Sequence, residues 1–175
     1  MRAITLTVTA VAAALALTAC DDGGGGGTGG DKSTNSSACR IGEVSVQIGS
    51  ASMAPAAGDS GEVPVSITNQ SAACTLDGFA GVELRADGTS EKVPALEGAT
   101  GQKLKLAKGD SASFTISYVR GKDGDTAGLA AQSVKIGLPG SGTSQSFPWK
   151  YGPIAAKGGG SGPDASVSGF QQAGD

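Results

Sequence analysis

The sequence predicts an all-β protein folded as an antiparallel β-sandwich of seven or eight strands. From Val44 onwards, apolar residues alternate with polar ones, the two-residue period of a strand that buries one face. Turn residues separate these segments, and no segment shows the 3.6-residue period of an amphipathic helix. The alternating segments span residues 44–48, 63–67, 82–86, 104–106, 112–118, 134–138 and 147–151.

Glycine, aspartate and proline supply turns between these segments, where the strands must reverse direction. The turn sequences lie at residues 58–61, 87–88, 108–110, 121–128 and 139–142. Pro64 and Pro148 have no backbone N–H to donate, so we expect them in edge strands or at bulges. Residues 167–170 predict a short closing strand.

Residues 1–19 have the organisation of an export signal. Arg2 is the only charged side chain among them, and an uncharged, largely apolar run follows it. A membrane-spanning helix needs about twenty apolar residues, whereas this run ends at Cys20 and two aspartates. The sequence therefore favours a cleaved signal peptide over a membrane span.

Leu17, Thr18, Ala19 and Cys20 resemble the bacterial lipobox, in which an aliphatic residue and two small residues precede a cysteine. The resemblance implies diacylglyceryl transfer to the Cys20 thiol and cleavage just before it. A thiol is the only strong nucleophile at this point, and small side chains let a peptidase approach the backbone. We predict lipidation at Cys20, with Leu17, Thr18 and Ala19 as the residues that the signal peptidase recognises.

Cysteine parity predicts a disulfide. Three thiols in an exported protein would leave one unpaired, whereas lipidation of Cys20 leaves Cys39 and Cys74 as an even pair. Two thiols in a chain without histidine are a poor ligand set for zinc. We expect a Cys39–Cys74 disulfide, no metal and no cofactor.

Residues 20–37 predict a lipidated cysteine followed by a Gly/Ser-rich tether. After Cys20 the segment has no large apolar residue to pack, so we expect a random coil with a reach of about 20 to 25 Å. Two acyl chains hold a protein on a bilayer stably, whereas one does so marginally. The predicted location is the extracytoplasmic face of the cell membrane, with membrane lipid as a partner.

The composition excludes several classes of function. The chain has no histidine, so Ser-His-Asp and Cys-His catalysis and His-ligated metal sites cannot be assembled. Thirteen Lys and Arg against sixteen Asp and Glu give a net charge of −3 without a basic stripe, which argues against nucleic acid as a partner.

Two motifs that suggest catalysis or nucleotide binding have simpler explanations. Residues 25–33 approach a phosphate-binding loop, but Asp31 breaks its spacing and would repel phosphate. Residues 58–61 spell Gly-Asp-Ser-Gly, yet no histidine can accept the Ser60 proton, so a turn explains them better.

Two candidate ligand sites stay open at this level. Asp123 and Asp125 could begin a calcium loop, although most acidic loops of this kind are simply solvated. Phe147, Trp149 and Tyr151 share one face of a predicted strand and could stack on a sugar. We favour the alternative that these aromatic residues fill the core, where aromatic side chains are usually found.

Residues 74–82 read Cys-Thr-Leu-Asp-Gly-Phe-Ala-Gly-Val and resemble the Cys-x-Leu-x-Gly-Tyr/Phe-Pro-Gly-Val signature of a family of actinobacterial secreted lipoprotein domains. Residues 67–69 and 106–112 match further parts of the family pattern, although Ala80 and Lys108 stand where proline is common. The resemblance covers residues 38–173. It implies an immunoglobulin-like sandwich in which Cys39 pairs with Cys74, and it supplies no established function.

These observations predict three segments, namely a signal peptide (1–19), a lipidated tether (20–37) and an immunoglobulin-like domain (38–173). We expect a non-enzymatic binding or structural module at the cell envelope, with a cell-wall glycan or an envelope protein as partner. One alternative is a carbohydrate-binding module that uses Trp149 and Tyr151. Another is a hydrolase that works with carboxylates alone, such as Asp123 with Asp125.

Overall fold

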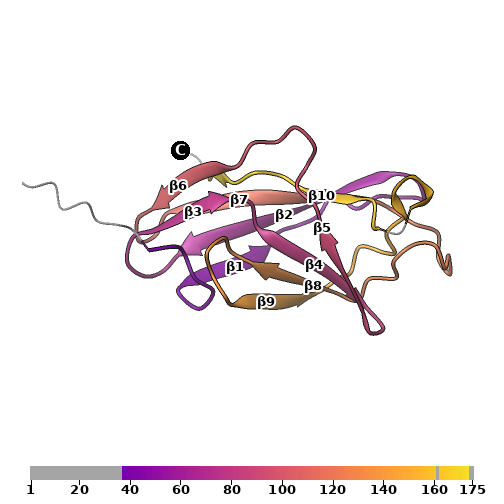
Figure 1. Cartoon of the computed structure of the whole chain (residues 1–175), viewed down its shortest axis with the longest axis horizontal. Coiled ribbons are helices and arrows are strands. Elements are labelled where there is room, and N and C mark those ends of the chain that lie inside the picture. Colours follow the sequence, from indigo (N-terminus) through magenta and orange to yellow (C-terminus); the bar gives the residue numbers. More distant parts are fainter. Residues whose placement is uncertain (1–36, 161, 174–175) are drawn as a thin grey trace, which may run out of the picture. The chain divides into compact units, whose positions relative to one another are not determined.

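The computed structural model describes residues 37–160 and 162–173, which form an antiparallel β-sandwich (Figure 1). The predicted all-β class and the sandwich are therefore confirmed. The predicted signal peptide, the lipobox from Leu17 to Cys20 and the tether up to residue 36 lie outside the described residues. Within the described ranges, no helix is long and apolar enough to cross a membrane.

The described chain contains eleven strands and one short 3-10 turn, η1 (Lys157–Gly159). The strands are β1 (Val44–Ile48), β2 (Ser60–Asn69), β3 (Cys74–Gly78), β4 (Gly81–Ala86), β5 (Thr89–Val93), β6 (Gln102–Leu106), β7 (Ser111–Val119), β8 (Ser133–Gly137), β9 (Ser144–Pro148), β10 (Ala165–Val167) and β11 (Gln171–Gln172).

Three antiparallel sheets make up the sandwich. One has the order β1-β2-β7-β10, with β11 also paired to β7. The second has the order β5-β4-β8-β9, and β3 pairs with β6 in a two-stranded ribbon. Side chains from all three sheets meet in one hydrophobic cluster, in which the largest fully buried residues include Phe114, Phe170, Leu76 and Ile136.

The strand count exceeds the seven or eight predicted from the sequence. The β5 segment is not predicted because polar and charged residues interrupt its alternation. The β3 segment, in which Cys74 and Leu76 alternate with Thr75 and Asp77, is not predicted either, and pairing with β4 and β6 makes the two segments strands. The predicted strand at residues 147–151 instead lies at Ser144–Pro148. The predicted closing strand divides into β10 and β11 on either side of buried Phe170.

The two prolines have different outcomes. Pro148 ends β9, which is an edge strand of its sheet in the described chain, as predicted. Pro64 lies in β2, which is an inner strand between β1 and β7, so an edge position is wrong for it. Its carbonyl accepts a hydrogen bond from the Gly49 N–H just after β1 ends, so its missing N–H falls where the regular β1–β2 pairing has stopped.

The Cys39–Cys74 disulfide is present, as both parity and the family resemblance implied. The sulfurs are 2.05 Å apart, the Cα atoms are 4.9 Å apart and both side chains are buried. Beside the bridge, the Cys39 N–H donates to the Thr75 carbonyl at 3.0 Å. The bridge therefore ties the start of the described chain to β3.

Asn69 holds three segments together at the end of β2. Its amide nitrogen donates to the carbonyls of Ala72, Leu106 and Ala107 at 2.9, 3.1 and 3.2 Å, and its amide oxygen accepts from the Ser71 N–H at 3.0 Å. Asn69 is only 1% exposed. The Asn69-Gln-Ser sequon is thus closed to glycosylation in the folded domain, because its amide is buried and bonded.

Replacing both Cys39 and Cys74 by Ser should lower the free energy of unfolding by about 3 to 4 kcal/mol, because the bridge closes a loop of 35 residues in the unfolded chain. Urea unfolding followed by tryptophan fluorescence measures the change. Wild-type protein unfolded in the presence of a thiol reductant should match the double variant, and an unchanged urea midpoint in both would contradict the assignment.

Asn69→Ala should cost about 2 to 3 kcal/mol, since it leaves buried carbonyls without their donor. The matched control is Gln70→Ala at the next position, whose side chain is exposed and should change stability by about 0.5 kcal/mol or less. Equal losses in the two variants, measured by thermal unfolding, would show that the Asn69 amide does not join these segments.

Candidate functional site

The structure brings two of the predicted ligand residues to one hollow. Asp123 and Trp149 both line a shallow hollow of about 420 Å³, together with Gln132, Lys150 and Pro153. The hollow lies among the loops that follow β7 and β9, so residues far apart in sequence meet there. This is the place where a combined acidic and aromatic site would have to form.

Trp149, however, is largely a core residue. It is 6% exposed, its indole N–H donates to the Gly152 carbonyl at 2.7 Å, and its ring makes edge contacts with Tyr118 and Tyr151. A sugar-stacking platform needs an open ring face, which Trp149 does not offer. The interpretation that these aromatic residues pack the core describes Trp149 better.

Tyr151 is half-buried beside Trp149, and its backbone carbonyl accepts a hydrogen bond from the Tyr118 hydroxyl at 2.9 Å. The same hydroxyl lies 3.3 Å from the Ala54 N–H, which donates to it. Burial, followed by the nearby Tyr118, raises the pKa of Tyr151 above its ordinary value. Tyr151 therefore stays neutral and packs against the core near neutral pH.

Asp123 and Asp125 lie in an exposed loop after β7. The Asp125 carboxylate accepts a hydrogen bond from the Ala127 N–H at 2.9 Å, which shapes the loop locally. Within residues 37–160 and 162–173, no three acidic, cysteine or histidine side chains gather as metal ligands would. Both residues are exposed, and calcium binding by this loop stays a prediction.

A second hollow lies on the solvent-facing side of the β5-β4-β8-β9 sheet, and the sequence analysis did not find it. It has a volume of about 370 Å³, and we call it the glycine trough because Gly81 and Gly137 form part of its floor. These two glycines are direct cross-strand partners in β4 and β8. On the two inner strands, β4 and β8, this position therefore has no side chain.

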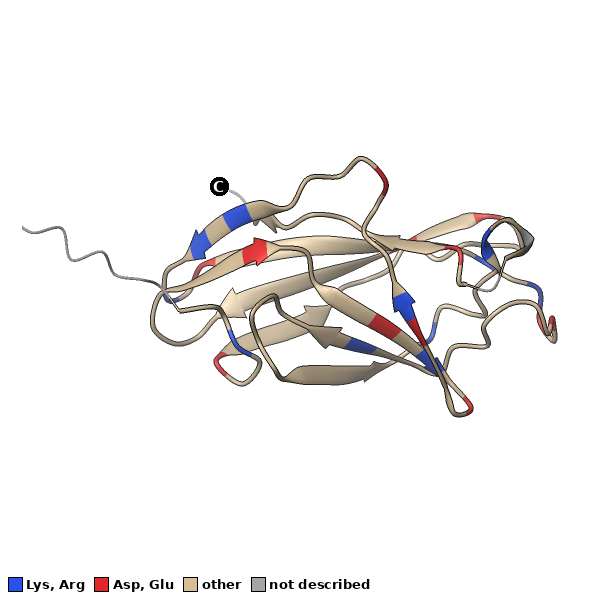
Figure 2. Cartoon of the chain, viewed as in Figure 1, with Lys and Arg blue, Asp and Glu red and all other residues tan. Residues whose placement is uncertain are grey.

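The rim of the trough carries charge. Glu83 on β4 is flanked across the strands by Lys92 on β5 and Lys135 on β8, and all three line the hollow. Figure 2 shows these charged positions gathered on the sheet formed by β4, β5 and β8. The other wall is the turn between β8 and β9, which contributes Ser141, Gly142, Thr143 and Ser144.

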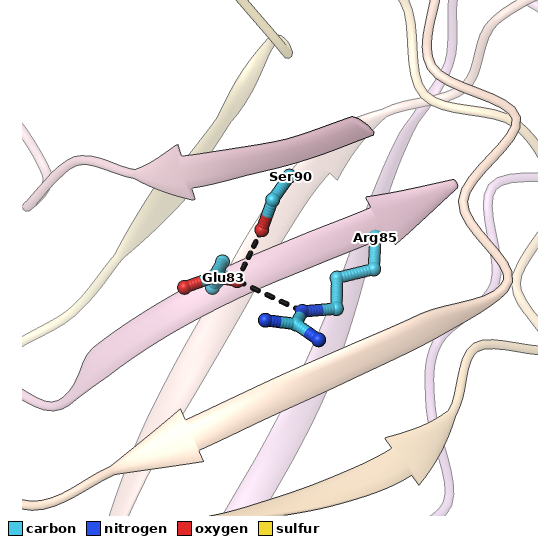
Figure 3. Close-up of polar contacts among 3 residues, drawn as sticks. All are labelled: Glu83, Arg85 and Ser90. Atoms are coloured by element: carbon cyan, nitrogen blue, oxygen red, sulfur yellow. Dashed lines mark hydrogen bonds and ion pairs between the residues drawn. The ribbon is translucent and has the colours of Figure 1, made fainter. Parts of the chain in front are cut away.

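Glu83 is bound to two neighbours that lie further along the sheet from the glycines (Figure 3). Its Oε1 atom accepts hydrogen bonds from the Ser90 hydroxyl and from the Arg85 Nε, the latter at 2.8 Å. The Ser90 hydrogen bond, and then Arg85, lower the pKa of Glu83 below its ordinary value. The side chain is 24% exposed, so Glu83 is a charged rim residue that stays ionised at neutral pH.

The sequence carried only a weak signal for this site. Glu83, Arg85 and Lys135 occupy the polar positions of alternating segments, which are normally just solvated. The β5 strand was not predicted, so nothing placed Lys92 beside Glu83. The antiparallel register, which a single sequence does not reveal, assembles the group.

The chain belongs to the family described as Domain of unknown function (DUF4232), which matches residues 39–171. The match begins at the disulfide and ends in β11, so it covers the sandwich. No curated protein matches the chain significantly. The family description itself assigns no activity.

Ser90→Ala should raise the pKa of Glu83 towards its ordinary value, because the first cause of its lowering is removed. Carbon-13 NMR of the Glu83 carboxyl group across a pH titration measures the shift. The control is Ser133→Ala, because Ser133 lies across from Arg85 on β8 and is not hydrogen-bonded to Glu83. An equal shift in both variants would contradict the assignment.

The lowered pKa of Glu83 also predicts how the stability of the fold changes with pH. Because the pKa of Glu83 is lower in the folded than in the unfolded state, the ionised group stabilises the fold above its unfolded value of about 4.3. That contribution should disappear as the pH falls through the lower folded pKa. Comparing urea midpoints of wild type and Glu83→Gln at pH 7 and pH 3 tests it, and a difference that grows on acidification would be inconsistent with it.

Proposed function

We propose that this protein is a lipid-anchored, non-enzymatic binding module of the cell envelope. The observation that carries the proposal is the assignment of its three cysteines. Cys39 and Cys74 form the disulfide, which leaves Cys20 as the remaining thiol, and Cys20 stands in the lipobox-like sequence. Attachment of a diacylglycerol to the Cys20 thiol would explain why a third cysteine stands at this position.

The disulfide also supports the location. Structural disulfides persist in oxidising compartments and are rare in the cytosol of mesophiles. A sandwich closed by such a bridge fits the outer side of the membrane, which is where a lipobox would deliver it. The narrower assignment to the actinobacterial secreted lipoproteins belongs to this proposal, and the Cys74–Val82 signature supports it.

The chemistry of the described residues favours binding over catalysis. Glu83, the acidic residue on the rim of the glycine trough, is held ionised by Ser90 and Arg85. A general acid or base works best when its pKa is close to the working pH. A carboxylate with a lowered pKa is poorly suited to that role, and the polar trough beside it is suited to holding a ligand, with a wall glycan or an envelope protein as the proposed partner.

Cys20→Ser should abolish incorporation of an alkyne-labelled palmitate into the protein in growing cells. Each buried methylene of an acyl chain contributes about 0.8 kcal/mol to membrane binding, so the mature protein should lose stable membrane attachment without it. The control is the double variant Cys39→Ser, Cys74→Ser, which must keep the label. Label retained by Cys20→Ser, or a native protein whose Cys20 thiol is unmodified by mass spectrometry, would refute the anchor.

A further inference from the structure

The charges around the glycine trough are not balanced. Within the described residues, the ion pairs are Arg85 with Glu83 at 2.8 Å and Lys103 with Asp77 at 3.5 Å. Lys92 and Lys135 are in neither pair, although both flank Glu83. Lys135 also interacts electrostatically with Glu83. One carboxylate nevertheless faces three cations, Arg85, Lys92 and Lys135, so this face carries excess positive charge on a chain whose net charge is −3.

The pairing register of β4 with β5 and β8 determines which part of the trough lies beside Lys92 and Lys135. Arg85 and Ser90 are cross-strand partners on one side of the row Lys92, Glu83, Lys135, and the glycines lie on the other side. Figure 3 shows the contacts of Glu83 with Arg85 and Ser90. By the register, these two residues lie on the side away from the glycine floor. Arg85 does not line the trough, so Lys92 and Lys135 are the cations among its lining residues.

The floor of the trough is open because Gly81 and Gly137 have no side chains, and not because their backbone adopts a strained conformation. A Cβ atom at Gly81 would meet nothing nearer than the Gly137 carbonyl oxygen at 3.9 Å. At Gly137, a Cβ would meet its nearest atom, the Thr143 carbonyl oxygen, at 3.7 Å. Neither glycine has the positive φ that would require glycine, so their effect here is to leave space on the sheet.

The opposite wall offers hydroxyl groups. The Ser141 and Thr143 hydroxyls are hydrogen-bonded to each other at 3.0 Å, which fixes the turn. Ser144, at the start of β9, has a hydroxyl that makes no hydrogen bond within the described part of the chain, and it is exposed on the rim. No aromatic side chain lines the trough, so a neutral sugar would find no ring to stack on.

We propose that the glycine trough binds a phosphate-bearing sugar or polyol. The phosphate lies over the glycine floor, on the glycine side of Glu83, where Lys92 and Lys135 approach it, and the ligand hydroxyls meet Ser144 at the start of β9. Lysine binds phosphate as a point charge, and its long flexible stem lets Lys92 on β5 and Lys135 on β8, the strands on either side of β4, converge on one anion. The proposal deepens the proposed function, because it names the ligand class of the binding module.

The test is a titration of the full-length protein in detergent with glucose 6-phosphate, glucose and inorganic phosphate. Nitrogen-15 NMR reports binding through the Gly81 and Gly137 backbone amides, which lie in the floor. The expected order of affinity is glucose 6-phosphate above inorganic phosphate, with no response to glucose. Equal affinity for glucose 6-phosphate and inorganic phosphate, no response to either, or a response to glucose would overturn the proposal.

Matched lysine variants separate a specific site from general charge. Lys92→Gln with Lys135→Gln should weaken glucose 6-phosphate binding by about tenfold or more, because two charge-assisted contacts are lost. Lys103→Gln with Lys105→Gln removes the same charge from β6 and should change the affinity by about twofold or less, the range of a distant screened charge. Similar weakening by both double variants would overturn the proposal.

A second variant tests the floor without changing charge. Gly81→Ala adds a methyl group into open space, so the fold should keep or slightly raise its melting temperature, whereas ligand affinity should fall. Unchanged affinity in a folded Gly81→Ala protein would overturn the placement of the ligand. These readouts do not involve Cys20, so failure here is distinguishable from failure of the lipid anchor.

Discussion

The buried Cys39–Cys74 disulfide is the constraint on which much else depends. It ties the beginning of the domain to β3 by a covalent bond, beside the Cys39 to Thr75 hydrogen bond. A chain with 30 glycines loses much backbone entropy when it folds, and a cross-link reduces that loss by restricting the unfolded state. The bridge also accounts for two of the three thiols, so the same bond bears on both stability and the chemistry at Cys20.

Two polar side chains complete this organisation from inside. Asn69 joins the end of β2 to the segment before β3 and to the end of β6, and the Tyr118 hydroxyl joins β7 to the segments at Ala54 and Tyr151. Each hydrogen-bonds buried or part-buried backbone groups that would otherwise be costly to remove from water. Asn69 in β2 and Tyr118 in β7 therefore hold the neighbouring loops in place. The charged residues of the trough lie on the outer face of the other sheet.

The sequence predicts some strands of this fold well and others poorly. Buried strands with regular alternation, such as β7 and β8, were found because one face of each packs in the core. The sequence does not predict β5, and it places β9 too far along the chain, because the polar residues of these strands give no periodic apolar signal. The glycine trough was missed for a related reason, since its residues come from β4, β5, β8 and a turn that only the pairing register brings together.

The sequence by itself determined the all-β class, the family signature around Cys74 and the pairing of Cys39 with Cys74, because periodicity, turn chemistry and cysteine parity are local or countable properties. Only the tertiary structure decided that Trp149 is buried and that Lys92 and Lys135 flank an already paired Glu83. Burial and cross-strand neighbours depend on which strands pair and in what register, and the alternation of residues along one strand does not contain that information.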